Sequence, residues 1–208
     1  MRRICFAFIG LCLVGFLTSF AAENQSQLHV YRVSEEFDAR RPFYLWEEEL
    51  GKNCSFYKEW NGISTRMYAV FNQNYLHLGF LIRDPFLSFA DDYSLDFAGS
   101  DHLRLYLKFP VADREELVMY IHPYSKIKEP LCYLPGVTWR HAGFLLSSHV
   151  ESDRYFLSVS IPLAETGFSP RYGQKIDFKG IIYNIADDGS VREYPLGAAE
   201  DYLTLIFR

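Results

Sequence analysis

The strongest constraint on the fold is a period-two alternation of apolar and polar residues within short segments. The apolar side chains of three segments each fall on one face of an extended chain: Leu76, Leu78, Phe80 and Ile82; Leu103, Leu105, Leu107 and Phe109; and Tyr155, Leu157, Val159 and Ile161. Such alternation is typical of β-strands with one buried face. Because each apolar face must be covered, the chain is predicted to fold as two packed sheets.

Short apolar segments between turn residues predict eight strands. They are Thr65–Phe71, Tyr75–Arg83, His102–Phe109, Glu115–His122, Gly143–Val150, Tyr155–Ile161, Ile176–Ala186 and Tyr202–Phe207. Helical periodicity is scarce, and only Arg41–Leu50 and Leu163–Thr166 are predicted to form short helices. About eight or more antiparallel strands favour an all-β fold, a β-sandwich of the jelly-roll type, with an up-and-down barrel as the alternative.

Composition narrows the class of protein further. The chain has 208 residues, of which 49% are hydrophobic and 17% aromatic, so a disordered tail is excluded. The net charge is -5 and no basic block is present, which argues against a nucleic-acid partner. The mean hydropathy of -0.08 argues against a polytopic membrane protein.

The N-terminus has the pattern of a secretory signal peptide. Arg2 and Arg3 precede the charge-free apolar run Ile4–Phe20, and a small-residue cleavage site ends at Ala21. We therefore expect the first 21 residues to be removed, which leaves one domain over residues 22–208 in the periplasm or outside the cell. The mature chain is then expected to have no stable membrane insertion. The alternative is an uncleaved anchor, since the run is close to a bilayer-spanning length.

Three segments occur in an order that resembles a known family. NQNYLHLGFLIRD is a predicted strand that ends on Asp84, and GSDHLRLYLKF is a strand led by Asp101. The third, FLSVSIPLAETGFSPRYGQKIDFKGIIYNIADDGS, joins two strands through a Gly- and Pro-containing turn. Together they resemble the family 9 carbohydrate-binding-module-like domains, which are secreted β-sandwiches related to the DOMON group. The resemblance spans roughly Val30 to Phe207.

This resemblance implies an exported, non-catalytic domain that binds a ligand, with a carbohydrate or glycan as the expected partner. The alternative is a structural or assembly protein of the envelope that keeps the fold without binding sugar. A hydrolase is a third hypothesis, although the sequence has no GxSxG, HExxH or P-loop motif. Fold alone does not decide among these functions.

Two tryptophans in polar loops are candidate sugar platforms. The C–H face of a sugar ring packs on a flat aromatic side chain, while its hydroxyl groups need polar neighbours. Trp60 lies in a polar turn, and Trp139 precedes Arg140 in a proline-rich loop. The alternative is that each indole packs over an end of the sandwich. Trp46 follows an apolar run and is expected in the core.

A polar strand face is the second candidate site. Alternation places Arg104 and Tyr106 opposite the apolar face of one strand, and Tyr120 and His122 on one face of another. His77 lies opposite the apolar face of its own strand. If the strands adjoin, these five side chains form one hydrogen-bonding surface. An ordinary solvated face is the alternative, because sequence does not fix which strands are neighbours.

Four acidic residues are candidate calcium ligands, since Ca²⁺ prefers several carboxylate and carbonyl oxygens. They are Asp84, Asp101, Asp187 and Asp188. An acidic loop is also commonly just solvated, so this site is a hypothesis, and no other cofactor is expected. Cys54 and Cys132 remain after signal-peptide removal, and they are predicted either to form a disulfide or to be two buried thiols.

Overall fold

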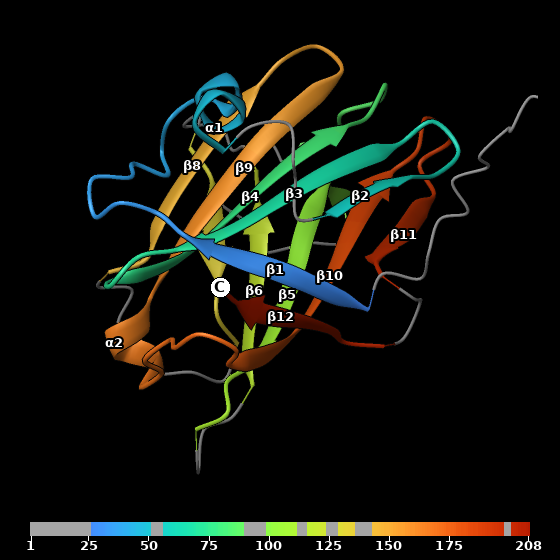
Figure 1. The fold of residues 1–208 in the computed structure, drawn as a ribbon. Helices are drawn as coiled ribbons and strands as arrows, with labels where there is room; N and C mark the ends of the chain where they lie inside the picture. Colours follow the sequence, from blue (N-terminus) through green and yellow to red (C-terminus); the bar gives the residue numbers. More distant parts are fainter. Residues whose placement is uncertain are drawn as a thin grey trace, which may run out of the picture.

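A computed structural model shows an all-β domain with two short helices (Figure 1). It describes residues 26–50, 56–89, 99–111, 116–123, 129–135, 143–197 and 201–208. The strands are β1 Gln27–Arg32, β2 Phe56–Glu59, β3 Ser64–Phe71, β4 Tyr75–Arg83, β5 His102–Lys108, β6 Leu117–His122, β7 Leu131–Tyr133, β8 Leu145–Val150, β9 Arg154–Pro162, β10 Lys175–Ile185, β11 Val191–Leu196 and β12 Leu203–Phe207. The helices are α1 Phe43–Leu50 and α2 Leu163–Thr166.

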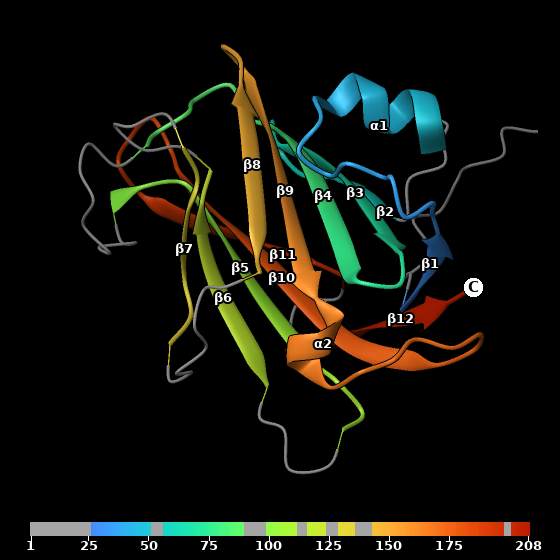
Figure 2. The ribbon, with the colours of Figure 1, turned by 90° about the vertical axis from the view of Figure 1, so that its left-hand side faces the viewer.

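Strand β1 is the corner at which one continuous sheet turns into two layers. Its first part, Gln27–Val30, pairs in parallel with β12, and its last two residues pair in parallel with β3. On one side of it follow β12, β10, β5, β6 and β7, which we call the β5 layer, with β11 beside β10. On the other side follow β3, β4, β9 and β8, the β4 layer, with β2 beside β3. Figure 2 shows the two layers facing each other.

The predicted sandwich is therefore confirmed, with one correction. The strands were expected to pair antiparallel, but both pairs made by β1 are parallel. Burial follows the alternation seen in the sequence: Leu103, Leu105 and Leu107 on β5 are fully buried. They face Leu76, Leu78 and the other apolar residues of β4 in a single core between the layers.

A second, smaller core covers the outer face of the β4 layer. The segment before α1 and the helix itself bring Phe37 and Trp46 onto that face, where they pack with Tyr68 and Phe156. The Trp46 indole donates a hydrogen bond to the carbonyl oxygen of Ala39 (3.3 Å) and makes edge contacts with the Phe37 and Phe156 rings. Trp46 is thus in the core, as predicted.

Gly79 of β4 leaves space for the indole ring of Trp46 on this face. A Cβ atom on Gly79 would lie 3.0 Å from a ring carbon of Trp46 and 3.1 Å from one of Phe156. Any larger residue at this position would push one of the rings outward, so glycine lets the strand and the helix approach closely here.

All eight predicted strands and both predicted helices are present, with ends that shift by a few residues at most. Four strands were not predicted, namely β1, β2, β7 and β11. Three of them have few buried side chains, because they lie at or near the edges of the layers. The predicted signal peptide lies outside the described residues, and among those that are described no helix is long and apolar enough to cross a membrane.

The packing of Trp46 gives a testable prediction for stability. Its side chain is only 1% exposed, so Trp46→Ala leaves a large cavity and should lower the free energy of unfolding by about 3–5 kcal/mol. Urea unfolding followed by circular dichroism measures this change. Tyr44→Ala, at an exposed position of the same helix, is the control and should change stability by less than about 0.5 kcal/mol. Equal effects of the two substitutions would contradict the packing described.

Candidate functional site

A cluster of aromatic side chains around one arginine lies on the outer face of the β5 layer. Register places Arg104 on β5 directly opposite Tyr120 on β6, and Tyr120 opposite Tyr133 on β7. The Arg104 guanidinium lies between two rings, with its carbon 4.4 Å from the Tyr120 centroid and 4.3 Å from that of Tyr183 on β10. We call Arg104, Tyr120, Tyr133 and Tyr183 the tyrosine–arginine face.

Two histidines extend this face along β5 and β6. The ring of His102 stacks on that of Tyr183, with centroids 4.4 Å apart and planes at 5°. The Nδ1 atom of His102 is 2.9 Å from the carbonyl oxygen of Ser100, and that of His122 is 2.9 Å from the Ser100 hydroxyl. Burial lowers the pKa of His102 to about 4 and also lowers that of His122, so both rings are neutral at pH 7.

The tyrosine–arginine face combines exposed aromatic surface with fixed polar donors. Tyr133 is 39% exposed, while Arg104, Tyr106 and Tyr120 are half-buried. Cation–π contact on both sides restricts the guanidinium to one orientation. Within the described part of the chain, Arg104 has no ion pair with a carboxylate, and its Nε has no hydrogen-bond partner. Such a face can stack on an apolar ring surface and donate hydrogen bonds beside it.

The structure brings together four of the five side chains predicted to share a polar strand face. Arg104, Tyr106, Tyr120 and His122 lie on the outer side of adjacent strands, because β5 pairs with β6. Sequence reasoning missed His102, Tyr133 and Tyr183. His102 and Tyr183 occupy alternate positions on predicted strands and could have been found from that alternation, but Tyr133 lies on a strand too short to be recognised.

His77 was placed wrongly by the sequence. It belongs to β4, whose outer face is covered by the second core, and it is 2% exposed. Its Nδ1 atom lies 2.8 Å from the Ser160 hydroxyl, and its ring contacts that of Phe37 at 5.3 Å. His77 is therefore a buried structural residue in the other layer, away from the tyrosine–arginine face.

The predicted tryptophan platforms lie elsewhere or outside the described residues. Trp60 follows β2 and is half-buried against the main core, with its ring 5.4 Å from that of Tyr194. Lys58 places its ammonium group 5.2 Å from the indole centroid. Trp60 thus packs over the sandwich, the alternative given for it. Trp139 and Arg140 fall outside the described residues.

The four predicted metal ligands separate into two groups. Asp84 and Asp101 are buried together near the end of β10: Asp84 accepts a hydrogen bond from the Asn184 amide, and Asp101 accepts one from the Ile185 backbone N–H at 2.8 Å. Burial raises the pKa of both carboxyl groups, that of Asp101 to about 7, with Asp84 adding to the shift at Asp101.

Asp187 and Asp188 are exposed in the turn after β10, where Asp188 accepts hydrogen bonds from Ser190. The four candidate calcium ligands thus belong to two separate places in the fold, and calcium binding stays a hypothesis. In the described ranges no three metal-binding side chains come together. Asp84 and Asp101 instead anchor loops, because each accepts backbone hydrogen bonds, from Phe86 and Ser88 respectively.

Cys132 on β7 is partly buried against the main core, and burial raises the pKa of its thiol to about 12. Cys54 lies outside the described residues, so the disulfide and the pair of buried thiols both stay predictions.

Comparison with known proteins identifies the fold. Two solved structures of a family 9 carbohydrate-binding module from Caldicellulosiruptor kristjanssonii, one with glucose and one with cellotriose, superpose with TM-scores of 0.64 and 0.63. Each covers 88% of this chain, at 11% and 12% sequence identity, and 95% and 93% of the module. This chain has the fold of a family 9 carbohydrate-binding-module-like domain.

A third structure with this fold comes from Bacteroides uniformis. It is a candidate carbohydrate-binding protein with a TM-score of 0.58 and 11% identity, and the match covers 88% of this chain and 99% of that one. No family model matches the sequence of this family 9-like domain, and no curated protein matches it in sequence. At such low identity the likeness establishes the fold alone.

The buried imidazole of His77 makes the stability of this family 9-like domain depend on pH. Burial lowers the pKa of His77 from 6.5 to about 4, and Asp38 opposes the shift. The folded pKa is below the unfolded one, so the contribution is fully present above about pH 6.5 and is lost as pH falls toward 4. The full loss is about 3 kcal/mol, at about 1.4 kcal/mol per pKa unit.

Comparison with His77→Asn isolates this contribution, because asparagine does not titrate. The difference in unfolding free energy between the native protein and His77→Asn should shrink from pH 6.5 to pH 4 in urea unfolding. A difference that stays constant over this range would show that the imidazole is not buried in the neutral form.

Proposed function

We propose that this protein is an exported, non-catalytic carbohydrate-binding domain whose sugar lies on the tyrosine–arginine face. Two observations support the proposal. The fold is that of modules solved with glucose and with cellotriose, over 88% of this chain. The outer face of the β5 layer carries partly exposed aromatic rings beside polar donors, which is the chemistry that a sugar requires.

The observation that carries the proposal is the exposed ring of Tyr133 next to Tyr120. Their centroids are 6.1 Å apart and tilted by 55°, so the rings form a bent platform across β6 and β7. A sugar ring whose C–H face covers Tyr133 removes apolar surface from water on both molecules. The hydroxyl groups at the edge of that sugar would lose water and need donors in exchange.

Arg104 supplies those donors in a fixed position. Because the guanidinium is held between Tyr120 and Tyr183, its N–H groups need little further ordering when a ligand hydroxyl accepts from them. His102 and His122 are only 2% and 1% exposed and already bond to Ser100, so they support the face from beneath. The N–H groups of Arg104 and the hydroxyl groups of Tyr120 and Tyr133 are therefore the groups that would meet the hydroxyls of the sugar.

The buried acids bear on the hydrolase hypothesis. A glycoside hydrolase needs two carboxyl groups that face the bond to be cleaved. Asp84 and Asp101 are 3% and 1% exposed, and both accept backbone hydrogen bonds from the loops they anchor. This arrangement favours a structural role for that pair, which agrees with binding rather than hydrolysis as the proposed function.

A glycan array followed by calorimetry on the best neutral oligosaccharide tests the proposal. Tyr133→Ala should weaken binding by about 1–3 kcal/mol, a factor of about 5 to 150, because the stacking surface is lost. Stability should change little, since Tyr133 lies on the surface. The control is Tyr172→Ala, which removes a 79% exposed tyrosine outside this face and should leave the affinity unchanged.

Three other outcomes have distinct meanings. Binding that Tyr133→Ala leaves intact would move the sugar to another surface. An array without any bound glycan would favour a structural or assembly protein of the envelope. Release of shorter sugars from a bound oligosaccharide would establish the hydrolase.

A further inference from the structure

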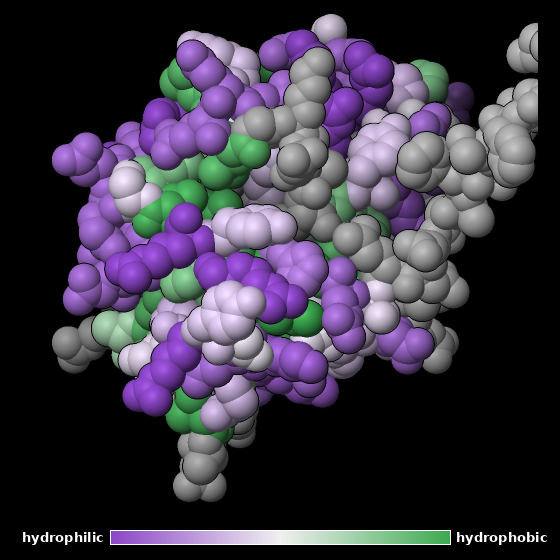
Figure 3. Space-filling model, viewed as in Figure 1, coloured by the Kyte–Doolittle hydropathy of each residue, from purple (hydrophilic) through white to green (hydrophobic). Residues whose placement is uncertain are grey.

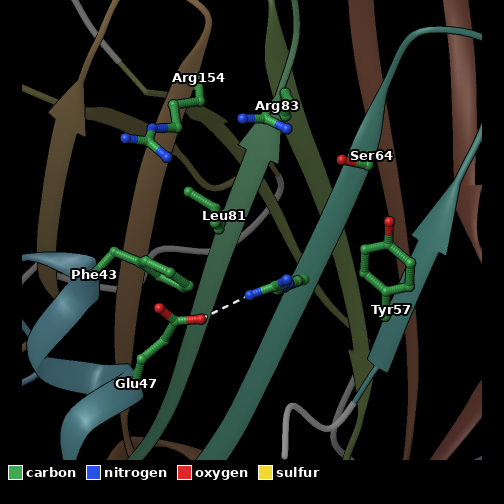
Figure 4. Close-up of a pocket in the computed structure, with 8 residues that line it drawn as sticks. Phe43, Glu47, Tyr57, Ser64, Leu81, Arg83 and Arg154 are labelled. Atoms are coloured by element: carbon green, nitrogen blue, oxygen red, sulfur yellow. Dashed lines mark hydrogen bonds and ion pairs between the residues drawn. The ribbon is translucent and has the colours of Figure 1, made fainter. Parts of the chain in front are cut away.

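A pocket lies on the outer face of the β4 layer, between α1 and the ends of β3, β4 and β9 (Figure 4). It has a volume of about 200 Å³, and its central residue is Leu81 on the outer face of β4. Phe43 and Glu47 reach it from α1, and Tyr57 closes the other side from β2. The pocket shares no residue with the tyrosine–arginine face.

Three arginines line this pocket, against one carboxylate. Arg66, Arg83 and Arg154 come from β3, β4 and β9, and Glu47 is the acid. Two more carboxylates lie beside the pocket, since Glu151 contacts Arg154 and Asp153 contacts Arg83. The arginines therefore distinguish this pocket by the many N–H donors that they bring to it.

Strand register places two of these arginines directly against each other. Arg83 on β4 is the cross-strand partner of Arg154 on β9, and Ser64 on β3 is the next residue in the same row. Like charges that face each other across a strand pair are destabilising. Figure 4 shows Arg83 and Arg154 side by side at one end of the pocket, on the far side of Leu81 from Glu47.

Each arginine of the pocket has one acidic partner. Glu47 is paired with Arg66, at 2.7 Å between Oε1 and Nη1. Arg154 binds Glu151, and Arg83 lies 3.6 Å from Asp153, both on the turn between β8 and β9. The Arg83 contact is longer than a hydrogen bond. A guanidinium group has five N–H donors, so all of those of Arg83 and several of those of Arg154 stay available, although Glu151 takes two from Arg154.

Apolar surface adjoins the arginines. The Phe43 ring and Leu81 line the pocket and also line a neighbouring one of about 500 Å³ that contains Val150 and Phe156. Figure 3 shows apolar side chains among hydrophilic ones in this region, near α1, β8 and β9. The neighbouring pocket is also lined by Glu47 and Glu151, so a ligand whose anionic group lies at Arg83 would place an uncharged body with an apolar face there.

We propose that this pocket is a separate binding site for an anionic sugar residue, whose carboxylate is held by Arg83 and Arg154 and whose ring lies on Leu81 and Phe43. Arginine matches a planar carboxylate with two parallel hydrogen bonds, and two opposed arginines can hold both oxygens. The Ser64 hydroxyl, beside Arg83 in the same cross-strand row, is a further hydrogen-bond donor to the carboxylate. The bound anion also offsets the repulsion between the two guanidinium groups.

The choice of a sugar as the carrier of the carboxylate rests on the proposed function, whereas the preference for an anion rests on the arginines. Neutral sugars are expected at the tyrosine–arginine face, where the accessible polar groups are tyrosine hydroxyls and one arginine. The two sites thus differ in the charge of the sugar that they bind. A chain that contains uronic acid residues could occupy either site.

Thermal unfolding with D-glucuronate, D-glucose or sodium sulfate as the probe tests this site, since a ligand of the folded state raises the melting temperature. At equal concentration and ionic strength, D-glucuronate should raise it most in the native protein. Arg83→Gln and Arg154→Gln should each weaken glucuronate binding about tenfold or more in calorimetry. Arg192→Gln is the matched control, because Arg192 is also an exposed arginine with one acidic partner, on β11.

A second readout separates binding from a structural role of the arginines. Without ligand, Arg83→Gln should leave the melting temperature unchanged or raise it, because one of two opposed charges is removed. A marked fall with unchanged glucuronate affinity would show that the arginines only form structural ion pairs. Equal stabilisation by sulfate and glucuronate would show a site for free inorganic anions, and no stabilisation by glucuronate would overturn the site altogether.

Tyr133→Ala keeps this test independent of the neutral-sugar site. The variant should bind glucuronate with native affinity, since Tyr133 lies on the other layer. Glucuronate binding that disappears in Tyr133→Ala but persists in Arg83→Gln would overturn the arginine site and assign the anion to the tyrosine–arginine face. If neutral glycans fail to bind and glucuronate still requires Arg83, the proposed function fails while this proposal stands.

Discussion

The middle of the β4 layer, around Gly79, is buried on both faces, and the rest of the molecule is arranged around that requirement. Its inner face packs on the β5 layer, and its outer face accepts Trp46 and Phe37 from the segment that leads into α1. Gly79 lies beneath the indole ring of Trp46, so strand β4 and helix α1 are close together there. The second core covers most of the outer surface of β3, β4 and β9. The arginines of the pocket therefore lie toward the strand ends, beyond α1.

Among the described residues, no second core covers Arg104, Tyr120 and Tyr133 on the outer face of the β5 layer. Alternating residues on β5 and β6 turn polar and aromatic groups outward while leucines fill the core. The two layers therefore present two kinds of surface: tyrosine rings around one arginine on one, and opposed arginines beside apolar residues on the other. On each strand the outward residues are those that alternate with the core residues.

Alternation in the sequence predicted the layers and the outward positions of Arg104, Tyr106, Tyr120 and His122, because these depend only on a period of two. It could not predict that His77, which has the same pattern, is buried, because residues 33–50 cover it from outside the sheet. The opposition of Arg83 and Arg154 depends on the register between β4 and β9, which is set by tertiary packing. The sequence identified Asp84 and Asp101 as candidate ligands. It could not show that they lie apart from Asp187 and Asp188, because that depends on the paths of the loops.

The parallel pairing of β1 with β12 has a consequence for how the domain is made. Gln27 pairs with Thr204, so the two strands that close the corner lie at opposite ends of the sequence. On a ribosome β1 emerges early and must wait for β12 before its first four residues can pair. Contacts between such distant segments form slowly. Until then the edge of β10 that β12 will occupy stays open, and this newly made chain is at that stage most exposed to pairing with a neighbour.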